Sequence, residues 1–287
     1  MLFSRARAKI NLSLSVRGRR ADGFHDLASV VAFARFGDAL WLEPGDALSL
    51  TVEGPTAQAA GSGDDNLVLS AARNLAERVP GLRTGAFALV KRLPVAAGLG
   101  GGSSDAAAAL RLLARANALS PDDPRLMQAA IATGSDVPVC LAGRVCVMSG
   151  AGADLGPPLA LPPLYVVLAN PGVAVETRRV FAAMGLKPGA TALASPVPKL
   201  DATTAEAWIA ALKRGGNDME DAACSLAPVI VDVLAVLAAA RGCGLARMSG
   251  SGATCFGLFW DRNAAARAAR AIQAGHPDWW VKASVIG

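Results

Sequence analysis

The first clear pattern along the chain is an alternation with period two. From residue 10 to residue 16, isoleucine, leucine, leucine and valine alternate with asparagine and serines. This pattern predicts a half-buried β-strand. Successive side chains of a strand point to opposite faces, so Lys9 and Asn11 share the polar face. Two residues whose polar groups could take part in binding or catalysis therefore share one face of the strand.

Helical and strand patterns alternate after this strand, which indicates an α+β protein. Apolar residues at helical spacing follow the acidic start at residues 64–66, and glycine and proline separate the later segments. The expected helices are 66–78, 104–117, 124–132, 176–184, 205–213, 229–241 and 262–274, and the expected strands are 10–16, 87–91, 165–169, 245–248, 253–260 and 281–286. A stretch rich in glycine and proline at 153–163 predicts a boundary between two domains, 1–155 and 156–287.

Composition excludes several classes of protein. Hydrophobic residues make up 53% and charged residues 18% of the 287 residues, so the chain can bury a core and wholesale disorder is excluded. The five cysteines form no C-x-x-C pair and the chain has two histidines. These counts argue against a zinc site and against a histidine-dependent hydrolase. We expect reduced thiols and a cytoplasmic protein, without a signal peptide or an apolar run long enough to span a membrane.

The net charge of +5 raises the question of a nucleic-acid partner. The densest basic cluster, Arg17, Arg19 and Arg20, is followed at once by Asp22, and few aromatic residues interleave with basic ones. We therefore expect no nucleic-acid partner and no membrane partner. A mild positive balance also suits a small anionic substrate.

A glycine-rich loop precedes the helix expected at 104–117. Consecutive glycines let the backbone approach a ligand closely, and the start of a helix attracts anions through its unpaired N–H groups. We expect Ser103 and Ser104 to cap the helix and to offer hydroxyls to phosphate or a metal ion. The alternative is a flexible turn that only caps the helix. Walker A and Rossmann loops fit less well, because Ser103 stands where they require Lys or Gly.

The loop resembles the phosphate loop of the GHMP kinases, small-molecule kinases that act on substrates such as galactose, homoserine and mevalonate. Gly-Ser-Gly-Ala at 250–253 resembles the C-terminal glycine motif of that family, and Ala-Lys-Ile-Asn-Leu at 8–12 resembles its N-terminal motif. Segments 20–25, 134–138 and 170–173 are similar to the branch whose substrate carries a cytidine diphosphate group. Together these segments span nearly the full chain.

The resemblance implies a fold and a reaction. The fold would be a two-domain α+β GHMP kinase, with an N-terminal domain like ribosomal protein S5 and a ferredoxin-like C-terminal domain. The reaction would be ATP-dependent phosphorylation of a hydroxyl on a small molecule with a cytidine diphosphate group. The residues expected to bind ATP are Pro94, Val95, Ala96, Ala97, Gly98, Leu99, Gly100, Gly101, Gly102, Ser103 and Ser104.

The resemblance also implies roles in catalysis. Asp136 would be the general base that orients the acceptor hydroxyl and takes its proton. Lys9 would keep Asp136 ionised and stabilise charge on the transferring phosphoryl group. The alternatives are a turn-capping aspartate and a solvated lysine. Mg²⁺ would arrive with ATP and touch Ser103 or Ser104, because we find no dedicated protein ligand set for a metal.

Five residues would bind the substrate by the same resemblance: Asn11, Phe24, His25, Thr177 and Phe181. His25 would read the cytosine ring by hydrogen bonds, and Phe24 and Phe181 would stack on it. The family often has tyrosine where this chain has Phe24, so a phenolic hydrogen bond is absent here. Ala96 and Ala97 replace glycines that are common at the start of the loop, a mild change that stiffens it.

Three other functions remain open at the level of the sequence. A related kinase for homoserine or mevalonate would keep the loop without the Phe24–His25 pair. An ATP-binding sensor would keep the loop without Lys9 and Asp136. A nucleic-acid-binding module would need a contiguous basic face. We expect a monomer or a weak homodimer.

Overall fold

The computed structural model describes residues 1–61 and 63–287 of the chain. The chain forms two compact units: unit 1 comprises residues 1–9, 36–95 and 100–143, and unit 2 comprises residues 10–35, 96–99 and 144–287. Neither unit is one continuous stretch, because the chain passes from one to the other several times. A single domain boundary after residue 155 stays a prediction.

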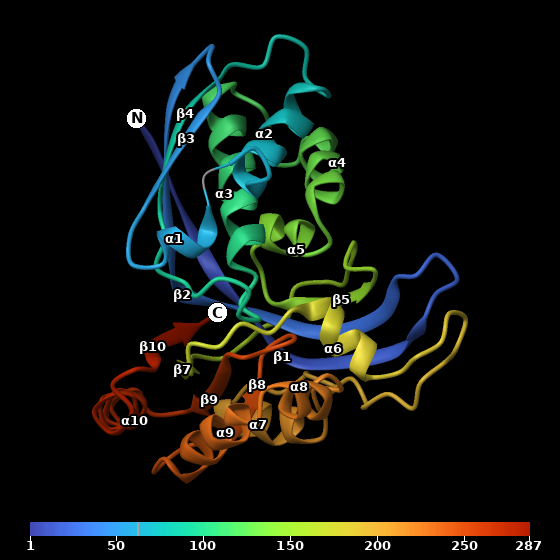
Figure 1. Ribbon diagram of the computed structural model, residues 1–287, viewed down its shortest axis with the longest axis vertical. Helices are drawn as coiled ribbons and strands as arrows, with labels where there is room; N and C mark the ends of the chain where they lie inside the picture. Colours follow the sequence, from blue (N-terminus) through green and yellow to red (C-terminus); the bar gives the residue numbers. More distant parts are fainter. Residues whose placement is uncertain (62) are drawn as a thin grey trace. The chain divides into compact units, whose positions relative to one another are not determined.

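Two long strands run through both units (Figure 1). The first, β1 (Leu2–Arg19), contains the predicted strand and extends beyond it in both directions. It pairs with β2 (His25–Gly45), which the sequence did not reveal. Residues 28–34 of β2 are all buried. A strand with both faces buried shows no alternation of apolar and polar residues, which explains the omission.

Unit 1 sets helices against one face of its strands (Figure 1). β4 (Thr84–Val90) is parallel to β3 (Ser49–Glu53) and antiparallel to the second half of β2. The helices are α1 (Ala57–Ala60), α2 (Leu67–Ala76), α3 (Gly101–Ala116), α4 (Pro124–Thr133) and α5 (Val137–Ala142). Residues 104–110 of α3 are all buried. Because four of these seven are alanines, neighbouring elements can approach the helix closely.

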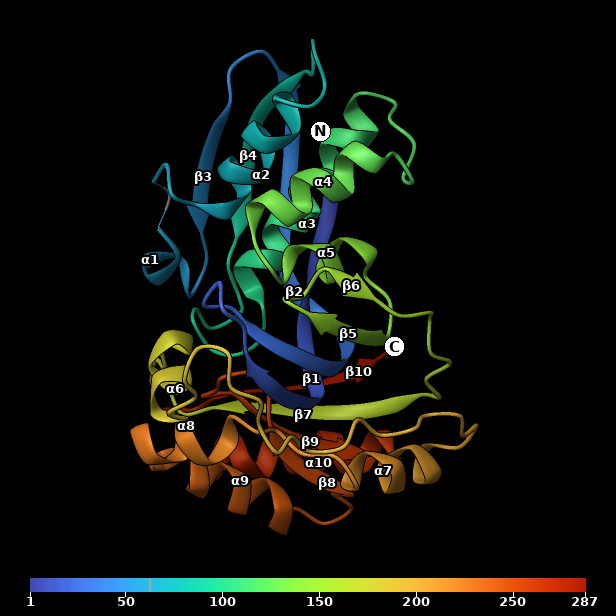
Figure 2. The same cartoon turned by 90° about the vertical axis from the view of Figure 1, so that its right-hand side faces the viewer.

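Unit 2 is built on an antiparallel sheet in the order β10-β7-β9-β8. Helices α9 and α10 pack against it, and both views show them beside its strands (Figures 1 and 2). The first half of β2 pairs with β5. The elements are β5 (Cys146–Gly150), β6 (Asp154–Leu155), β7 (Leu164–Asn170), α6 (Thr177–Ala183), α7 (Ala205–Lys213), α8 (Glu220–Leu226), α9 (Val229–Ala239), β8 (Leu245–Met248), β9 (Cys255–Phe259), α10 (Arg262–Gly275) and β10 (Trp280–Ile286).

Most expected helices and strands are confirmed with shifted ends. The elements that the sequence did not reveal, besides β2, are short: β3, β5, β6, α1, α5 and α8. Segments of two to seven residues carry too few apolar positions for a period to be read. Among the described residues, no helix is both long enough and apolar enough to cross a membrane.

Candidate active site

Lys9 and Asp136 meet in unit 1, although 127 positions separate them in the sequence. The ammonium of Lys9 donates to Oδ2 of Asp136 over 2.7 Å. The side chain of Lys9 is 5% exposed, whereas that of Asp136 is 32% exposed. The pair therefore presents one buried cation and one accessible carboxylate. Such a carboxylate can accept a proton from a hydroxyl while the lysine fixes its orientation.

The backbone position of Asp136 favours this use of its side chain. Asp136 is the N-cap residue of α5, and Pro138 follows within the first turn. Its side chain makes no capping hydrogen bond. An N-cap aspartate commonly binds the first free N–H groups of its helix. Here the carboxylate points to Lys9 instead, so the turn-capping alternative does not describe it.

The loop that leads into α3 differs from the prediction in how its helix is capped. We expected Ser103 and Ser104 to cap a helix that starts near residue 104, and this is wrong. The helix starts at Gly101, Gly100 is its N-cap, and no side chain caps it. Ser104 is 2% exposed and donates its hydroxyl to the carbonyl of Arg7 over 2.7 Å. The free N–H groups of the first turn therefore stay available to a ligand.

Two glycines of the loop have backbone conformations that suit glycine. Gly98 has φ +75°, and a Cβ there would stand 2.1 Å from the carbonyl oxygen of Ser249. Gly100 has φ +59°, and a Cβ there would stand 3.0 Å from Cε of Lys9. The side chain of Lys9 therefore runs directly past the residue that begins the loop helix. Ala96 also has a positive φ, +50°, which costs about 1–2 kcal/mol in a residue with a Cβ.

Three buried ionisable residues of unit 1 were missed by the sequence analysis. Nζ of Lys91 lies 2.5 Å from a carboxylate oxygen of Asp38 and 2.7 Å from one of Asp105. Asp105 directly follows the loop, in α3. Burial, with the nearby Asp38, raises its pKa to about 8 against the opposing effect of Lys91. The three residues come from distant segments, so no local motif could reveal the cluster.

In unit 2, the ring of His25 stacks on the ring of Phe181, with centroids 3.8 Å apart and an angle of 7° between the planes. Burial and the neighbouring charge of Arg19 lower the pKa of His25 below its usual 6.5. The imidazole is therefore neutral at pH 7. Its buried Nε2 has no hydrogen-bond partner within the described chain. The hydrogen-bonding capacity of that atom is therefore unused within the described chain.

The other substrate-binding candidates also lie in unit 2. Phe24 is 59% exposed, and the His25 ring covers one face of the Phe181 ring. The side chain of Asn11 is buried and its amide donates to Ser29 over 2.7 Å, while its Oδ1 has no partner among the described residues. The hydroxyl of Thr177 lies 2.8 Å from that of Ser251.

The glycine motif at 250–253 is held by hydrogen bonds from Asn217, a residue that the sequence analysis did not select. Nδ2 of Asn217 donates to the carbonyls of Met248 and Gly250 over 2.9 and 2.8 Å. The hydroxyl of Ser249 donates to the carbonyl of Gly98 over 2.9 Å. Within unit 2, the motif and the middle of the phosphate loop are thus in direct contact. A lone asparagine between two helices gives no sequence signal for such a role.

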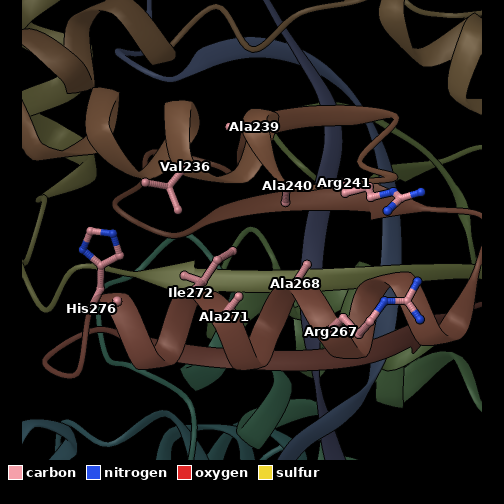
Figure 3. Close-up of a pocket in the computed structure, with 10 residues that line it drawn as sticks. Val236, Ala239, Ala240, Arg241, Arg267, Ala268, Ala271, Ile272 and His276 are labelled. Atoms are coloured by element: carbon pink, nitrogen blue, oxygen red, sulfur yellow. The ribbon is translucent and has the colours of Figure 1, made fainter.

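A groove between α9 and α10 is lined mainly by small and apolar residues (Figure 3). Arg241 and Arg267 lie at one end of it and His276 lies at the other. It contains none of the candidate site residues. Cys140 also has no catalytic use, because burial raises the pKa of its thiol to about 12 and the neutral thiol is a poor nucleophile.

Comparison with known proteins places these features in a family. The family described as GHMP kinases N terminal domain matches residues 66–144, and the family described as GHMP kinases C terminal matches residues 197–278. The chain belongs to the GHMP kinases. The matched N-terminal region of this GHMP kinase contains the phosphate loop and Asp136. The α+β fold and the family resemblance inferred from the sequence are thereby confirmed.

Relatives of this GHMP kinase are similar over its full length. A protein of Rhodopseudomonas palustris (strain BisB18) named 4-diphosphocytidyl-2-C-methyl-D-erythritol kinase is 57% identical, with 100% of this chain and 95% of the relative covered. A protein of the same name from Methylobacterium radiotolerans is 58% identical, with 98% and 97% covered.

Solved structures agree with these relatives. A crystal structure of 4-(cytidine 5'-diphospho)-2C-methyl-D-erythritol kinase matches with a TM-score of 0.75 and 34% identity, covering 100% of this chain and 99% of the other. Homoserine kinase from Cytophaga hutchinsonii matches with a TM-score of 0.66 but 17% identity, covering 99% and 96%. This second likeness concerns the fold alone.

Proposed function

We propose that this GHMP kinase transfers the γ-phosphoryl group of ATP to the 2-hydroxyl of 4-diphosphocytidyl-2-C-methyl-D-erythritol, a step of non-mevalonate isoprenoid precursor synthesis. The relatives at 55–58% identity carry the name of this activity. The structural observation that carries the proposal is the ion pair between Lys9 and Asp136 in unit 1, beside the start of α3.

The proposed chemistry uses this pair directly. The substrate hydroxyl forms an O–P bond with the γ-phosphorus while the bond between that phosphorus and ADP breaks, and the hydroxyl proton passes to Asp136. Lys9 donates a hydrogen bond to this carboxylate and has further N–H donors that can stabilise charge on the phosphoryl group. The acceptor is a hindered tertiary alcohol, so positioning must supply much of the rate.

The phosphate-binding role of residues 94–104 is supported by the start of α3. The N–H groups of Gly101, Gly102 and Ser103 precede the first helical hydrogen bond, which runs from Ser104 to Gly100. These donors and the helix dipole favour an anion. A Mg²⁺ ion carried by ATP would neutralise part of the triphosphate charge. Of the two serines, Ser103 suits contact with that ion better, because the Ser104 hydroxyl is buried and bonded to Arg7.

The cytidine-binding role is supported by the His25–Phe181 stack. A neutral imidazole with an unpartnered buried Nε2 can form a hydrogen bond with a cytosine edge. Phe24 offers an exposed ring face for stacking. Asn11, through its unpartnered Oδ1, and Thr177, which is exposed at the start of α6, would bind other polar groups of the substrate. Enclosure of cytosine by Phe24 and Phe181 stays a prediction.

The proposal is tested by measuring ADP release with three acceptors offered separately: 4-diphosphocytidyl-2-C-methyl-D-erythritol, homoserine and mevalonate. We expect turnover with the first alone. Turnover with homoserine or mevalonate instead would retain the family and discard the cytidine site. No turnover with any of the three, with ATP still bound, would favour a nucleotide-binding sensor.

A further inference from the structure

A cluster of ionisable side chains lies inside unit 1 at the two ends of the phosphate loop, residues 94–104. Lys91, Asp38 and Asp105 are 2%, 0% and 3% exposed. Burying an ionisable group away from water is costly, so three such groups are rarely kept together inside a protein without a purpose. The proposed transfer chemistry uses none of them. Their position suggests what they do.

Asp38, in β2, holds the chain where it enters the loop. Its Oδ1 accepts hydrogen bonds from the backbone N–H groups of Arg92 and Leu93 over 2.5 and 2.8 Å. Its Oδ2 accepts from the ammonium of Lys91, the residue directly after β4. One carboxylate thus fixes three donors from three consecutive residues. The loop proper begins at Pro94, immediately after them.

Lys91 and Asp105 hold the chain where it leaves the loop. The same ammonium that binds Asp38 donates to Oδ2 of Asp105, in α3, over 2.7 Å. Nζ of Lys91 also lies 3.4 Å from the point where a Cβ on Gly101 would stand. The cluster therefore lies beside the first turn of the helix whose N–H groups are proposed to bind phosphate.

We propose that Lys91, Asp38 and Asp105 form a clamp that joins the two ends of the phosphate loop and thereby sets the affinity for ATP. This inference rests on the proposed function only in taking ATP as the ligand of the loop. The three residues are positioning residues: they act through the backbone of residues 92–93 and 101. They make no contact with Lys9 or Asp136 in the described structure.

A clamp on the loop has a distinct kinetic consequence. The free N–H groups bind an anion well only if the backbone is held in its binding conformation before ATP arrives. Loosening the loop ends therefore weakens ATP binding more than it slows transfer at saturating ATP. A purely structural role would lower thermal stability without this separation.

The test compares two substitutions of one residue in the full-length protein. Asp105→Leu removes the contact with Lys91, whereas Asp105→Asn keeps an oxygen that accepts from the same ammonium. We expect calorimetry with ATP alone to show a Kd at least tenfold higher for the leucine variant and within threefold of wild type for the asparagine variant. The kcat of both at saturating ATP should stay within threefold of wild type.

Leu126→Ala supplies the matched control for lost stability. Leu126 is a buried residue of α4, and its truncation lowers the melting temperature without touching the loop. Its ATP affinity should equal that of wild type. Wild-type affinity in Asp105→Leu would overturn the clamp, as would equal weakening in both Asp105 variants, since the contact with Lys91, which only the asparagine keeps, would then not matter for binding.

Amide hydrogen exchange of wild type tests the clamp without any variant. Without nucleotide, the amides of Arg92 and Leu93 should be protected about as well as that of Ala88 in β4, because Asp38 already binds them. Exchange as fast as in an exposed loop would overturn the inference. Failure of wild type to bind ATP would instead count against the proposed function, since the exchange result does not depend on it.

Discussion

At the scale of single residues, Asp136 is the group whose loss should slow the reaction most. Asp136→Asn keeps the shape of the side chain and its contact with Lys9 but removes the proton acceptor. General-base catalysis commonly contributes roughly 10²–10⁴-fold. We expect kcat to fall within that range and both KM values to change by less than about threefold, measured by coupled ADP release. Asp122→Asn, an exposed acid of the same unit, should keep wild-type turnover; a loss of only a few-fold in Asp136→Asn would contradict the assignment.

His25 gives a prediction about pH. Because burial and Arg19 lower its pKa below 6.5, the neutral ring that reads cytosine persists as pH falls from 8 to 6.5. Below that, protonation removes its acceptor nitrogen. We expect KM for the cytidine substrate to be constant from pH 8 to 6.5 and to rise on further acidification. A rise in KM between pH 7.5 and 6.5 would contradict the role of His25 in reading cytosine. So would the same pH dependence of KM in the His25→Phe variant measured in parallel.

The candidate catalytic residues were predicted from the resemblance to the GHMP kinases. Lys9 and Asp136 are an ordinary lysine on a strand and an ordinary aspartate before a proline, and only the family pattern selected them. Their contact at 2.7 Å depends on the tertiary structure, so no local sequence pattern could predict it. Lys91, Asp38 and Asp105 belong to none of the motifs used, so their burial together could not be predicted. Asn217 was missed for the same reason.

At the scale of elements, the loop and its helix show how backbone geometry limits substitution. Gly98 has a positive φ and a carbonyl 2.1 Å from its virtual Cβ. Gly98→Ala should destabilise the protein by more than about 2 kcal/mol and raise the Kd for ATP, because the loop must move from Ser249. Thermal melting and ATP calorimetry measure both.

Gly275→Ala provides the control for the loop substitution. It adds the same methyl group at the end of α10, where nothing lies within 4 Å of the new atom. Alanine favours the helix over glycine by up to about 1 kcal/mol, so the melting temperature should stay equal or rise slightly. Equal behaviour of the two variants would mean that the loop tolerates a side chain at Gly98.

Some helices and strands could not be predicted from the pattern of apolar and polar residues. β1 was found because its middle alternates cleanly between large apolar and polar residues. Its start was missed although residues 5–9 continue the alternation, because their apolar members are only alanines, a weak strand signal. β2 was missed although it is the longest strand, since its buried run has no polar face. The start of α3 was displaced by three residues because glycines open this helix, where serine or aspartate is the usual signal.

At the scale of the whole molecule, the candidate residues divide between the two units. Unit 1 contains Lys9, Asp136 and the start of α3, and unit 2 contains His25, Phe181 and the glycine motif. The order of the motifs along the chain allowed the family and the reaction class to be predicted. The bounds of the two compact units could not be predicted, because the chain passes between the units several times. Composition changes visibly only near residue 155.

The most direct test of this account is the ratio of kcat/KM for 4-diphosphocytidyl-2-C-methyl-D-erythritol to that for 2-C-methyl-D-erythritol 4-phosphate. Both substrates carry the same acceptor hydroxyl, and only the first carries cytidine. Because the second leaves His25 and its stacking partners without a ligand, we predict a ratio on the order of 10³ or more. Phe181→Ala and His25→Ala should lower that ratio, and Asp136→Asn should slow both substrates alike. Equal kcat/KM for the two substrates in wild type would contradict the account.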